Sequence, residues 1–121
     1  MEKITYIITN DPRERCELVS SVFSQALISL SFGYECDVFL LDNGVRVAEK
    51  GYIDGLKADA FGLLSELVRN FKEMDGRLFV CNPAAASRNI RKEDCIDGVD
   101  DYVNAPAMIE SAKNSAAVFT F

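Results

Sequence analysis

The chain has 121 residues, of which 49% are hydrophobic and 26% are charged, an ordinary balance for a globular protein with one hydrophobic core. Its formal net charge of −6 argues against a protein that binds nucleic acid without regard to sequence, because such binding needs a basic face. The chain contains no histidine, which excludes Ser-His-Asp catalysis, Cys-His catalysis and metal sites with His ligands.

Residues 1–121 are predicted to form a single domain, which we expect in the cytoplasm. The N-terminus enters a strand pattern at once and lacks the apolar segment and cleavage site of a signal peptide. The most apolar helical stretch, 19–32, is interrupted by serines and is too short to span a bilayer. We therefore expect neither a membrane nor nucleic acid among the partners.

The first strand and helix have clear boundaries in the sequence. Residues 4–9 are β-branched or aromatic almost throughout, which is typical of a strand. Asp11 is the predicted N-cap of the next helix, and Pro12 is its predicted first residue. The apolar stripe of that helix ends at Phe32, and Gly33 supplies a left-handed position that stops it.

The later elements continue the alternation of strand and helix. They are predicted as a strand at 36–41, a turn at 42–44, a short helix at 45–50, an irregular loop at 52–57, a long helix at 59–74, a strand at 78–80, a short helix from Pro83, a weak strand at 98–103, a helix at 105–114 and a strand at 116–121. This order predicts an α/β fold, a three-layer sandwich in which a mainly parallel sheet of about five strands has helices on both faces.

Cys81 stands where the third long strand meets a helix. The strand must stop at Asn82-Pro83, because proline cannot donate to a sheet ladder and disfavours helical angles in the residue before it. Asn82 is the predicted N-cap, Pro83 the predicted first helical residue, and three alanines follow. Ligands of open α/β sheets bind outside the carboxyl ends of the strands, and a helix N-terminus favours thiolate over thiol. The alternative is that Cys81 is a small core residue, since free cysteine is often buried.

The other three cysteines, at positions 16, 36 and 95, carry weaker signals. No two of the four cysteines form a close pair, so neither a zinc ribbon nor a CxxC redox motif is present. Cys16 and Cys36 are predicted to pack in the core, and the role of Cys95 stays open. In a reducing compartment all four are expected as free thiols.

Two families of similar architecture fit the residues poorly. A flavin-phosphate loop after the first strand needs Ser, Thr and Gly, and residues 9–13 offer too few of them. A response-regulator receiver has an aspartate at the end of the third strand, where this chain has Cys81. No GxGxxG or Walker loop occurs either.

The order and spacing of several short segments resemble the DsrE/DsrF-like family of small α/β proteins. The segments are Gly33-Tyr34-Glu35, Asp42-Asn43-Gly44-Val45, Lys50-Gly51, Phe79-Val80-Cys81, Ser87-Arg88-Asn89-Ile90 and Ile96-Asp97-Gly98-Val99. Family members often have Gly at the position of Asn89, and asparagine also tolerates left-handed backbone angles.

The resemblance implies a flavodoxin-like parallel sheet and oligomers, commonly homotrimers or hexamers. In the sulfur-relay members a cysteine at the end of the third strand accepts sulfane sulfur as a persulfide and passes it to a partner thiol, and Cys81 matches that position. We expect Arg88 to add positive potential, and Asn82 with the main-chain N–H groups of Ala84 and Ala85 to receive negative charge. No metal or organic cofactor is expected, and a sulfur donor and an acceptor protein are the further partners.

A second hypothesis keeps the fold without the chemistry. In it the chain is a non-catalytic oligomeric binding or scaffold protein, Cys81 is inert, and Ala84-Ala85-Ala86 only pack against a neighbour. The exposure and the thiolate character of Cys81 distinguish the two hypotheses. The sequence leaves open whether Cys36 or Cys95 approaches Cys81 as a resolving thiol.

Overall fold

The computed structural model describes residues 2–121, and within them a five-stranded, all-parallel sheet is the organising element. Its strands lie in the order β6-β5-β2-β1-β7, so that β5 is an inner strand and β6 and β7 are the edges. Their bounds are β1 Lys3–Ile8, β2 Glu35–Leu40, β5 Arg77–Cys81, β6 Asp101–Val103 and β7 Ala117–Thr120. The predicted parallel sheet is confirmed.

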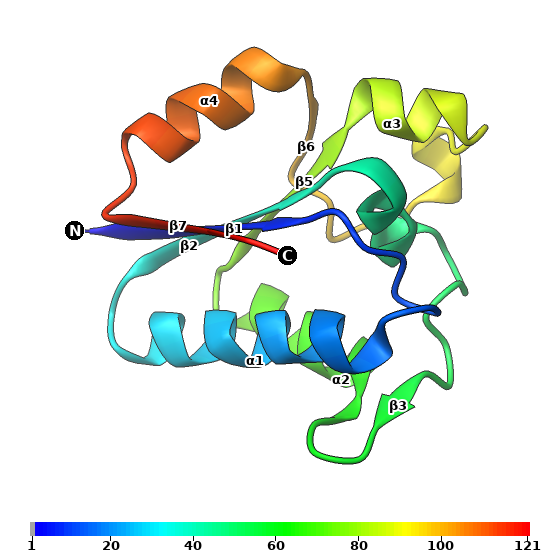
Figure 1. Cartoon of the computed structure of the whole chain (residues 1–121), viewed down its shortest axis with the longest axis horizontal. Helices are drawn as coiled ribbons and strands as arrows, with labels where there is room; N and C mark the ends of the chain where they lie inside the picture. The colour runs from blue at the N-terminus through cyan, green and yellow to red at the C-terminus, as the bar shows by residue number, and fades with distance from the viewer. Residues whose placement is uncertain (1) are drawn as a thin grey trace.

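Helices cover both faces of the sheet, as predicted (Figure 1). Helices α1 and α2 lie on one face, and α3 and α4 lie on the other. Their bounds are α1 Cys16–Ser31, α2 Leu64–Glu73, α3 Asn82–Ser87 and α4 Ala105–Lys113. Two 3₁₀ helices, η1 Asp42–Ala48 and η2 Lys92–Asp94, and a small hairpin, β3 Lys57–Ala58 with β4 Gly62–Leu63, complete the fold. None of the helices in this described part is both long and apolar enough to cross a membrane.

The two faces of the sheet differ in how well they are buried. Side chains alternate between faces along a strand, so Tyr6 and Ile8 point toward α1, where Tyr6 bonds Ser29. Their partners on the same face are also buried, and Phe23 of α1 meets Phe71 of α2 edge to face, 5.5 Å between centroids. The hydrophobic core therefore lies mainly between the sheet and α1 with α2.

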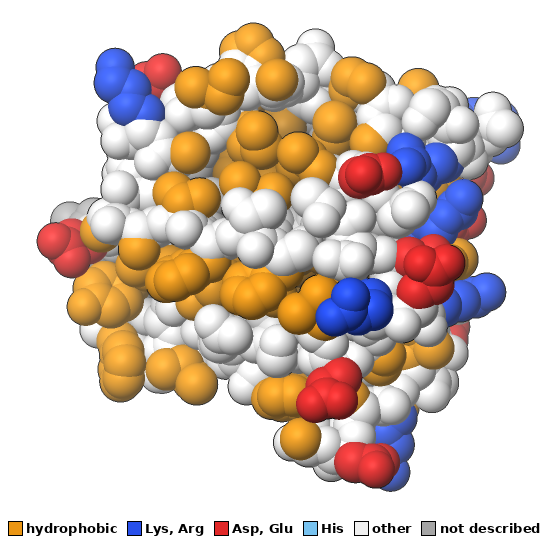
Figure 2. Space-filling view, viewed as in Figure 1, with side chains coloured by type: hydrophobic (Ala, Val, Ile, Leu, Met, Phe, Trp, Pro, Cys, Tyr) orange, Lys and Arg blue, Asp and Glu red, His pale blue; other side chains and the backbone are white. Residues whose placement is uncertain are grey.

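Apart from Phe39, which is buried, the opposite face carries polar or only half-buried side chains. On β1 they are Lys3, Thr5 and Ile7, and Ile7 is half-buried. Figure 2 shows hydrophobic side chains gathered along the β7 edge and in the space between α4 and α3. Of the residues of α4, only Ser111 is buried. The layer over this face is thus thin, and the cavity described below lies in it.

The first helix begins later than predicted. α1 starts at Cys16 with Arg15 as its N-cap, so the assignment of Asp11 as N-cap was wrong. The Asp11 carboxylate instead accepts the N–H of Arg13 and the hydroxyl of Tyr52, which holds residues 11–15 as a turn. The predicted end is confirmed, since α1 stops at Ser31 and Gly33 has φ +90.

The second long helix is also shorter than predicted. Residues 57–63 form the hairpin, and α2 begins at Leu64. Gly62 has φ +75, a left-handed angle that a right-handed helix cannot contain. The predicted apolar face therefore loses its first turn, and Met74 at its other end is 42% exposed rather than buried.

Candidate functional site

Strand β5 delivers Cys81 to the carboxyl end of the sheet. Leu78 and Val80 are fully buried on the α1 side, and alternation places Phe79 and Cys81 on the other face. Cys81 is the N-cap residue of α3, with φ −72 and ψ 116. The prediction that Asn82 would be the N-cap was wrong by one residue.

The side chain of Asn82 forms a hydrogen bond with the neighbouring strand, β6. Its Nδ2 donates to the main-chain oxygen of Tyr102 in β6, at 3.2 Å. That carbonyl lies near the end of an edge strand, where backbone groups need partners from side chains or water. Asn82 thus ties the start of α3 to β6. The side chain of the N-cap residue, Cys81, makes no hydrogen bond to the N-terminus of α3.

Cys81 opens on a small cavity of about 100 Å³ between α3 and α4. The walls come from four different segments of the chain, namely Phe39 and Leu41 at the end of β2, Pro83 of α3, Val103 and Asn104 at the end of β6, and Ala105 and Met108 of α4. A water molecule occupies roughly 30 Å³ of liquid, so the cavity admits only a few heavy atoms at a time.

The chemistry of this cavity rests on the thiol. Cys81 is its only ionisable lining side chain, and the amide of Asn104 is the only other polar one. Beside it, Phe39 and Phe79 stack with their centroids 4.7 Å apart. No other lining side chain can act as a general acid or base, so any chemistry in this cavity depends on the sulfur itself.

We expected Arg88 to add positive potential near Cys81, but its guanidinium is bound by residues of η1. Its Nη2 donates to Asp42 at 2.6 Å, its Nε donates to Asn43 at 2.9 Å, and its Nη1 donates to the carbonyl of Ala84 at 2.9 Å. Arg88 does not line the cavity of Cys81. Its charge is paired with Asp42, and the contacts join α3 to η1.

The three alanines of α3 differ in burial, with Ala84 half-buried and Ala86 exposed. Ala85 is buried, and its carbonyl accepts the N–H groups of Arg88 and Ile90. Asn89 has φ 58, the left-handed conformation expected at this position. Asn89 closes the short helix and turns the chain toward η2.

The remaining cysteines lie elsewhere. All four are free thiols, and neither Cys36 nor Cys95 lines the cavity of Cys81. Cys36 lies in the core, where burial and then the charge of Asp37 raise its pKa to about 12. Burial also raises the pKa of Cys95. Cys16 is half-buried on α1, its sulfur 3.8 Å from the hydroxyl of Ser20.

Most of the cavity wall was not identified from the sequence. Phe39, Val103 and Met108 carry no motif, and they meet Cys81 because β2, β5 and β6 are neighbours in the sheet. The available signal was that the carboxyl ends of parallel strands share one edge. Across residues 2–121, no group of three or more Cys, Asp or Glu side chains is placed to hold a metal ion.

Comparison with known proteins places the chain in a family. The model of the DsrE/DsrF-like family matches residues 2–121. The uncharacterized protein MJ0989 of Methanocaldococcus jannaschii is 34% identical over 119 residues, which cover 98% of this chain and 99% of that protein. The uncharacterized protein MK0008 of Methanopyrus kandleri is 28% identical over 100 residues, 83% of this chain and 78% of that protein.

Solved structures share the fold. The ychN protein from E. coli superposes with a TM-score of 0.70 at 16% identity, covering all of both chains. MTH1491 from Methanobacterium thermoautotrophicum, a protein of unknown function, superposes with a TM-score of 0.72 at 17% identity, covering 98% of this chain and 99% of that one. The family match over nearly the whole length and the 34% identical relative show that this chain belongs to the DsrE/DsrF-like family.

Proposed function

We propose that the protein is a sulfur carrier, a sulfurtransferase subunit that accepts sulfane sulfur on Cys81 and passes it to a partner thiol. The observation that carries the proposal is the position of Cys81, the only ionisable side chain lining an apolar cavity at the carboxyl end of β5. A family in which some members relay sulfur from such a position adds support.

The proposed reaction needs only thiol chemistry. The Cys81 thiolate attacks the outer sulfur of a donor persulfide R–S–SH, the donor S–S bond breaks, and R–S⁻ leaves. The sulfane sulfur and its proton stay on the protein as Cys81–S–SH. An acceptor thiolate then attacks that sulfur, and Cys81 leaves as thiolate. Sulfur is transferred without net oxidation, so no cofactor is required by these steps.

The neighbours of Cys81 have supporting roles in this proposal. The main-chain N–H groups of Ala84 and Ala85, in the first turn of α3, favour negative charge on the bound sulfur. Asn82 fixes the start of α3 to β6 through its hydrogen bond to Tyr102, and Arg88 fixes α3 to η1 through its bond to Asp42. The proposed partners are like copies of the chain, in a trimer or hexamer, together with a donor and an acceptor protein in the reducing cytoplasm.

A second candidate is a non-catalytic binding or scaffold protein with an inert Cys81. The observation that favours it is the small size of the cavity, about 100 Å³, beside a thiol that is only half exposed. In this candidate the cavity is a packing defect, and the exposed face around α4 is the functional surface.

The first prediction is that Cys81 alone gains a sulfur atom. After incubation with a persulfide donor, mass spectrometry of peptides is expected to show one added sulfur on Cys81, and Cys81→Ser is expected to abolish it. Cys16→Ser is the matched control, because Cys16 is also half-buried but lies on the opposite side of the sheet.

The carrier hypothesis and the scaffold hypothesis predict different results in this experiment. Sulfur on Cys81 that a thiol acceptor removes supports the carrier. A folded protein whose Cys81 stays unmodified, and resists alkylation as the pH is raised, supports the scaffold. Sulfur that persists in Cys81→Ser assigns the carrier role to another cysteine.

A further inference from the structure

Helices α1 and α2 leave a groove between their carboxyl-terminal turns. The groove has a volume of about 440 Å³, and its lining residues are Leu27, Ile28 and Ser31 of α1 with Asn70, Glu73 and Met74 at the end of α2. A second hollow of about 390 Å³ shares Met74 with it. Each hollow is several times larger than the cavity of Cys81. The two hollows together are called the α1–α2 groove below.

The groove is apolar although it faces solvent. Ile28 is 51% exposed and Met74 is 42% exposed. Phe32, whose ring meets that of Tyr34 in the second hollow, is 73% exposed. Figure 2 shows hydrophobic side chains at this end of the molecule, where α1 leads into β2. Single exposed apolar residues are ordinary, but a group of adjoining ones marks an interaction site.

The composition of α1 supports the same conclusion. Among its 16 residues, Glu17 is the only charged one. A solvated helix normally carries charged residues on its outer face, whereas the centre of a protein interface is depleted in them. Helix α1 therefore has the composition of a helix that a partner covers.

The charge around the groove is negative. Glu73 lines the first hollow, and Asp75 and Glu35 line the second. Among residues 2–121, neither Asp75 nor Glu35 forms an ion pair, and Glu73 pairs only with Arg69, at 3.7 Å between two exposed side chains. The carboxyl-terminal ends of α1 and α2 add partial negative charge, and α1 has no basic residue in its last turn.

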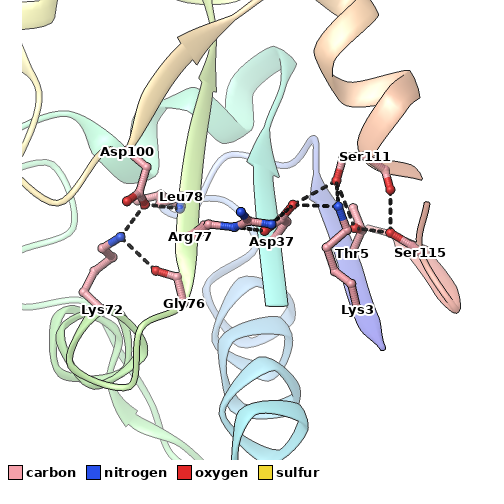
Figure 3. A network of polar contacts seen from close by, with 10 residues as sticks. All are labelled: Lys3, Thr5, Asp37, Lys72, Gly76, Arg77, Leu78, Asp100, Ser111 and Ser115. Carbon is pink, nitrogen blue, oxygen red and sulfur yellow. Dashed lines mark hydrogen bonds and ion pairs between the residues drawn. The ribbon is translucent and has the colours of Figure 1, made fainter. Parts of the chain in front are cut away.

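Two cations close to the groove are already bound to other groups (Figure 3). Arg77, in the second hollow, donates its Nε–H to Asp37 Oδ1 at 2.6 Å. Lys72, in the last turn of α2, donates from Nζ to the carbonyl of Gly76 at 2.8 Å and to Asp100. Neither is free to neutralise the carboxylates of the groove.

The pKa of Arg77 reports the same negative surroundings. It is raised above its ordinary value, first by the hydrogen bond to Asp37 and then by the charges of Asp37, Glu35 and Asp100, although burial acts in the opposite direction. A positive group that enters the second hollow is therefore stabilised there.

We propose that the α1–α2 groove binds a cationic amphipathic helix of another protein. The apolar side of that helix packs on Ile28 and Met74, with anchors at i, i+3, i+4 and i+7, and its flanking Lys or Arg residues meet the carboxylates of the groove. A third helix lying between two neighbouring helices is an ordinary packing. The negative charge disfavours an anionic membrane, which attracts basic segments. It also disfavours a second copy of this chain, whose net charge is −6.

This docking site is separate from the cysteine. The groove lies at the amino-terminal ends of β2 and β5, which begin at Glu35 and Arg77, whereas Cys81 ends β5 and lies on the other face of the sheet. A partner held in the groove leaves the cavity of Cys81 open. The docking site and the sulfur chemistry can therefore fail independently.

The test measures binding of two synthetic peptides to the native full-length chain. Both are amphipathic helices about four turns long with leucine at the apolar positions, and the polar positions carry lysine in one and glutamate in the other. Fluorescence anisotropy is expected to show binding of the lysine peptide in the micromolar range, about tenfold or more tighter than that of the glutamate peptide. Added salt should weaken the lysine peptide, because it screens the attraction.

A pair of isoleucine variants locates the binding surface. Ile28→Ser is expected to weaken binding of the lysine peptide about tenfold, because it removes an apolar anchor. Ile109→Ser is the matched control, since Ile109 is 61% exposed on α4, which covers the other face of the sheet. The control should bind the peptide like wild type.

Asp75→Asn tests the charge with little effect on the fold. Asp75 has φ +67, an angle that asparagine also adopts, so the turn after α2 is retained. The variant is expected to bind the lysine peptide about threefold more weakly and with a shallower dependence on salt. Asp59→Asn, at an exposed carboxylate in the turn between β3 and β4, is the control.

Three results would overturn the proposal. The first is equal affinity for the two peptides, or no binding of the lysine peptide. The second is an equal loss of affinity in Ile28→Ser and Ile109→Ser, which would mean that the peptide binds without a defined site. The third is a lower oligomeric mass of Ile28→Ser in sedimentation velocity, which would assign the groove to a second copy of the chain.

Discussion

At the scale of single residues, the surroundings of a cysteine decide what it can do. Cys81 borders a cavity, whereas Cys36 faces the core with 1% of its surface exposed. Burial, and then the negative charge of Asp37, raise the pKa of the Cys36 thiol from 9.0 to about 12. Cys36 therefore stays protonated in the folded protein at physiological pH and acts as a small apolar side chain.

This shift predicts how stability depends on pH. The unfolded chain releases the Cys36 proton near pH 9, and the folded chain keeps it until about pH 12. Between those values the unfolded state binds fewer protons, so the free energy of unfolding falls as the pH rises, by up to about 1.4 kcal/mol per pH unit for this group. Below pH 9 its contribution is fully present.

Cys36→Ala is expected to remove that part of the pH dependence. Urea unfolding followed from about pH 8 to about pH 10.5 should show a shallower loss of stability in the variant than in wild type. Burial also raises the pKa of Tyr102 to about 12. Its titration affects the stability of the wild type and of the variant equally. Val22→Ala, a core substitution without a titratable group, should lower stability by the same amount at every pH. If the free energy of unfolding fell equally with pH in wild type and in Cys36→Ala, the raised pKa of Cys36 would be contradicted.

At the scale of elements, the junction between β1 and η1 depends on a close backbone approach. A Cβ on Gly44 would lie 2.1 Å from the main-chain oxygen of Ile8, which already accepts the N–H of Leu41 at 2.9 Å. Backbone atoms cannot move aside as a flexible side chain does, so η1 would have to shift. That 3₁₀ helix supplies Asp42 and Asn43, the partners of Arg88.

Gly44→Ala is therefore expected to cost about 2–3 kcal/mol of stability, as overpacking does. Gly33→Ala serves as the comparison, because Gly33 has φ +90 but open space around its Cβ position. Gly33→Ala should cost about 1 kcal/mol of stability, because only the left-handed backbone angle is unfavourable for alanine there. Urea midpoints of the two variants measure the difference. A smaller effect at Gly44 than at Gly33 would mean that η1 adjusts freely.

At the scale of the whole molecule, the thinly covered face suggests where other chains bind. β7 is an edge strand, and its Val118, on the same face as Thr5, is 41% exposed. Phe119, on the α1 face beside Tyr6, is 45% exposed. Figure 2 shows that hydrophobic side chains gather along this edge. An exposed apolar edge strand favours association unless it is protected.

We accordingly expect the chain to form trimers or hexamers and Val118→Asp to shift it toward monomer. Sedimentation velocity over a range of concentrations gives the mass of each species. Leu63→Asp, at a similarly exposed apolar position on the β3–β4 hairpin, is the matched control and should leave the assembly intact. A wild-type protein that sediments as a monomer at all concentrations would refute self-association, and an unaffected Val118→Asp would place it on another surface.

Local stereochemistry made the main elements of this protein predictable. Strand β5 ends before Pro83 because proline cannot continue a ladder, and α1 ends before Gly33 because glycine adopts a left-handed angle at little cost. The alternation of strand and helix likewise determined a parallel sheet with helices on both faces. Each of these features depends on residues within a few positions of one another, so the sequence alone contains the signal.

Tertiary structure decided what surrounds Cys81. Phe39 and Met108 are far from Cys81 along the chain and meet it only because β2 and β6 flank β5 and α4 follows β6. Arg88 was expected near the thiol from its position, but Asp42 of η1 holds its guanidinium. Such pairings depend on which strands are neighbours and which charges find partners after packing, and these are long-range choices. The sequence located the thiol at the end of a strand, and the packing of distant segments made it the single ionisable group of an apolar cavity.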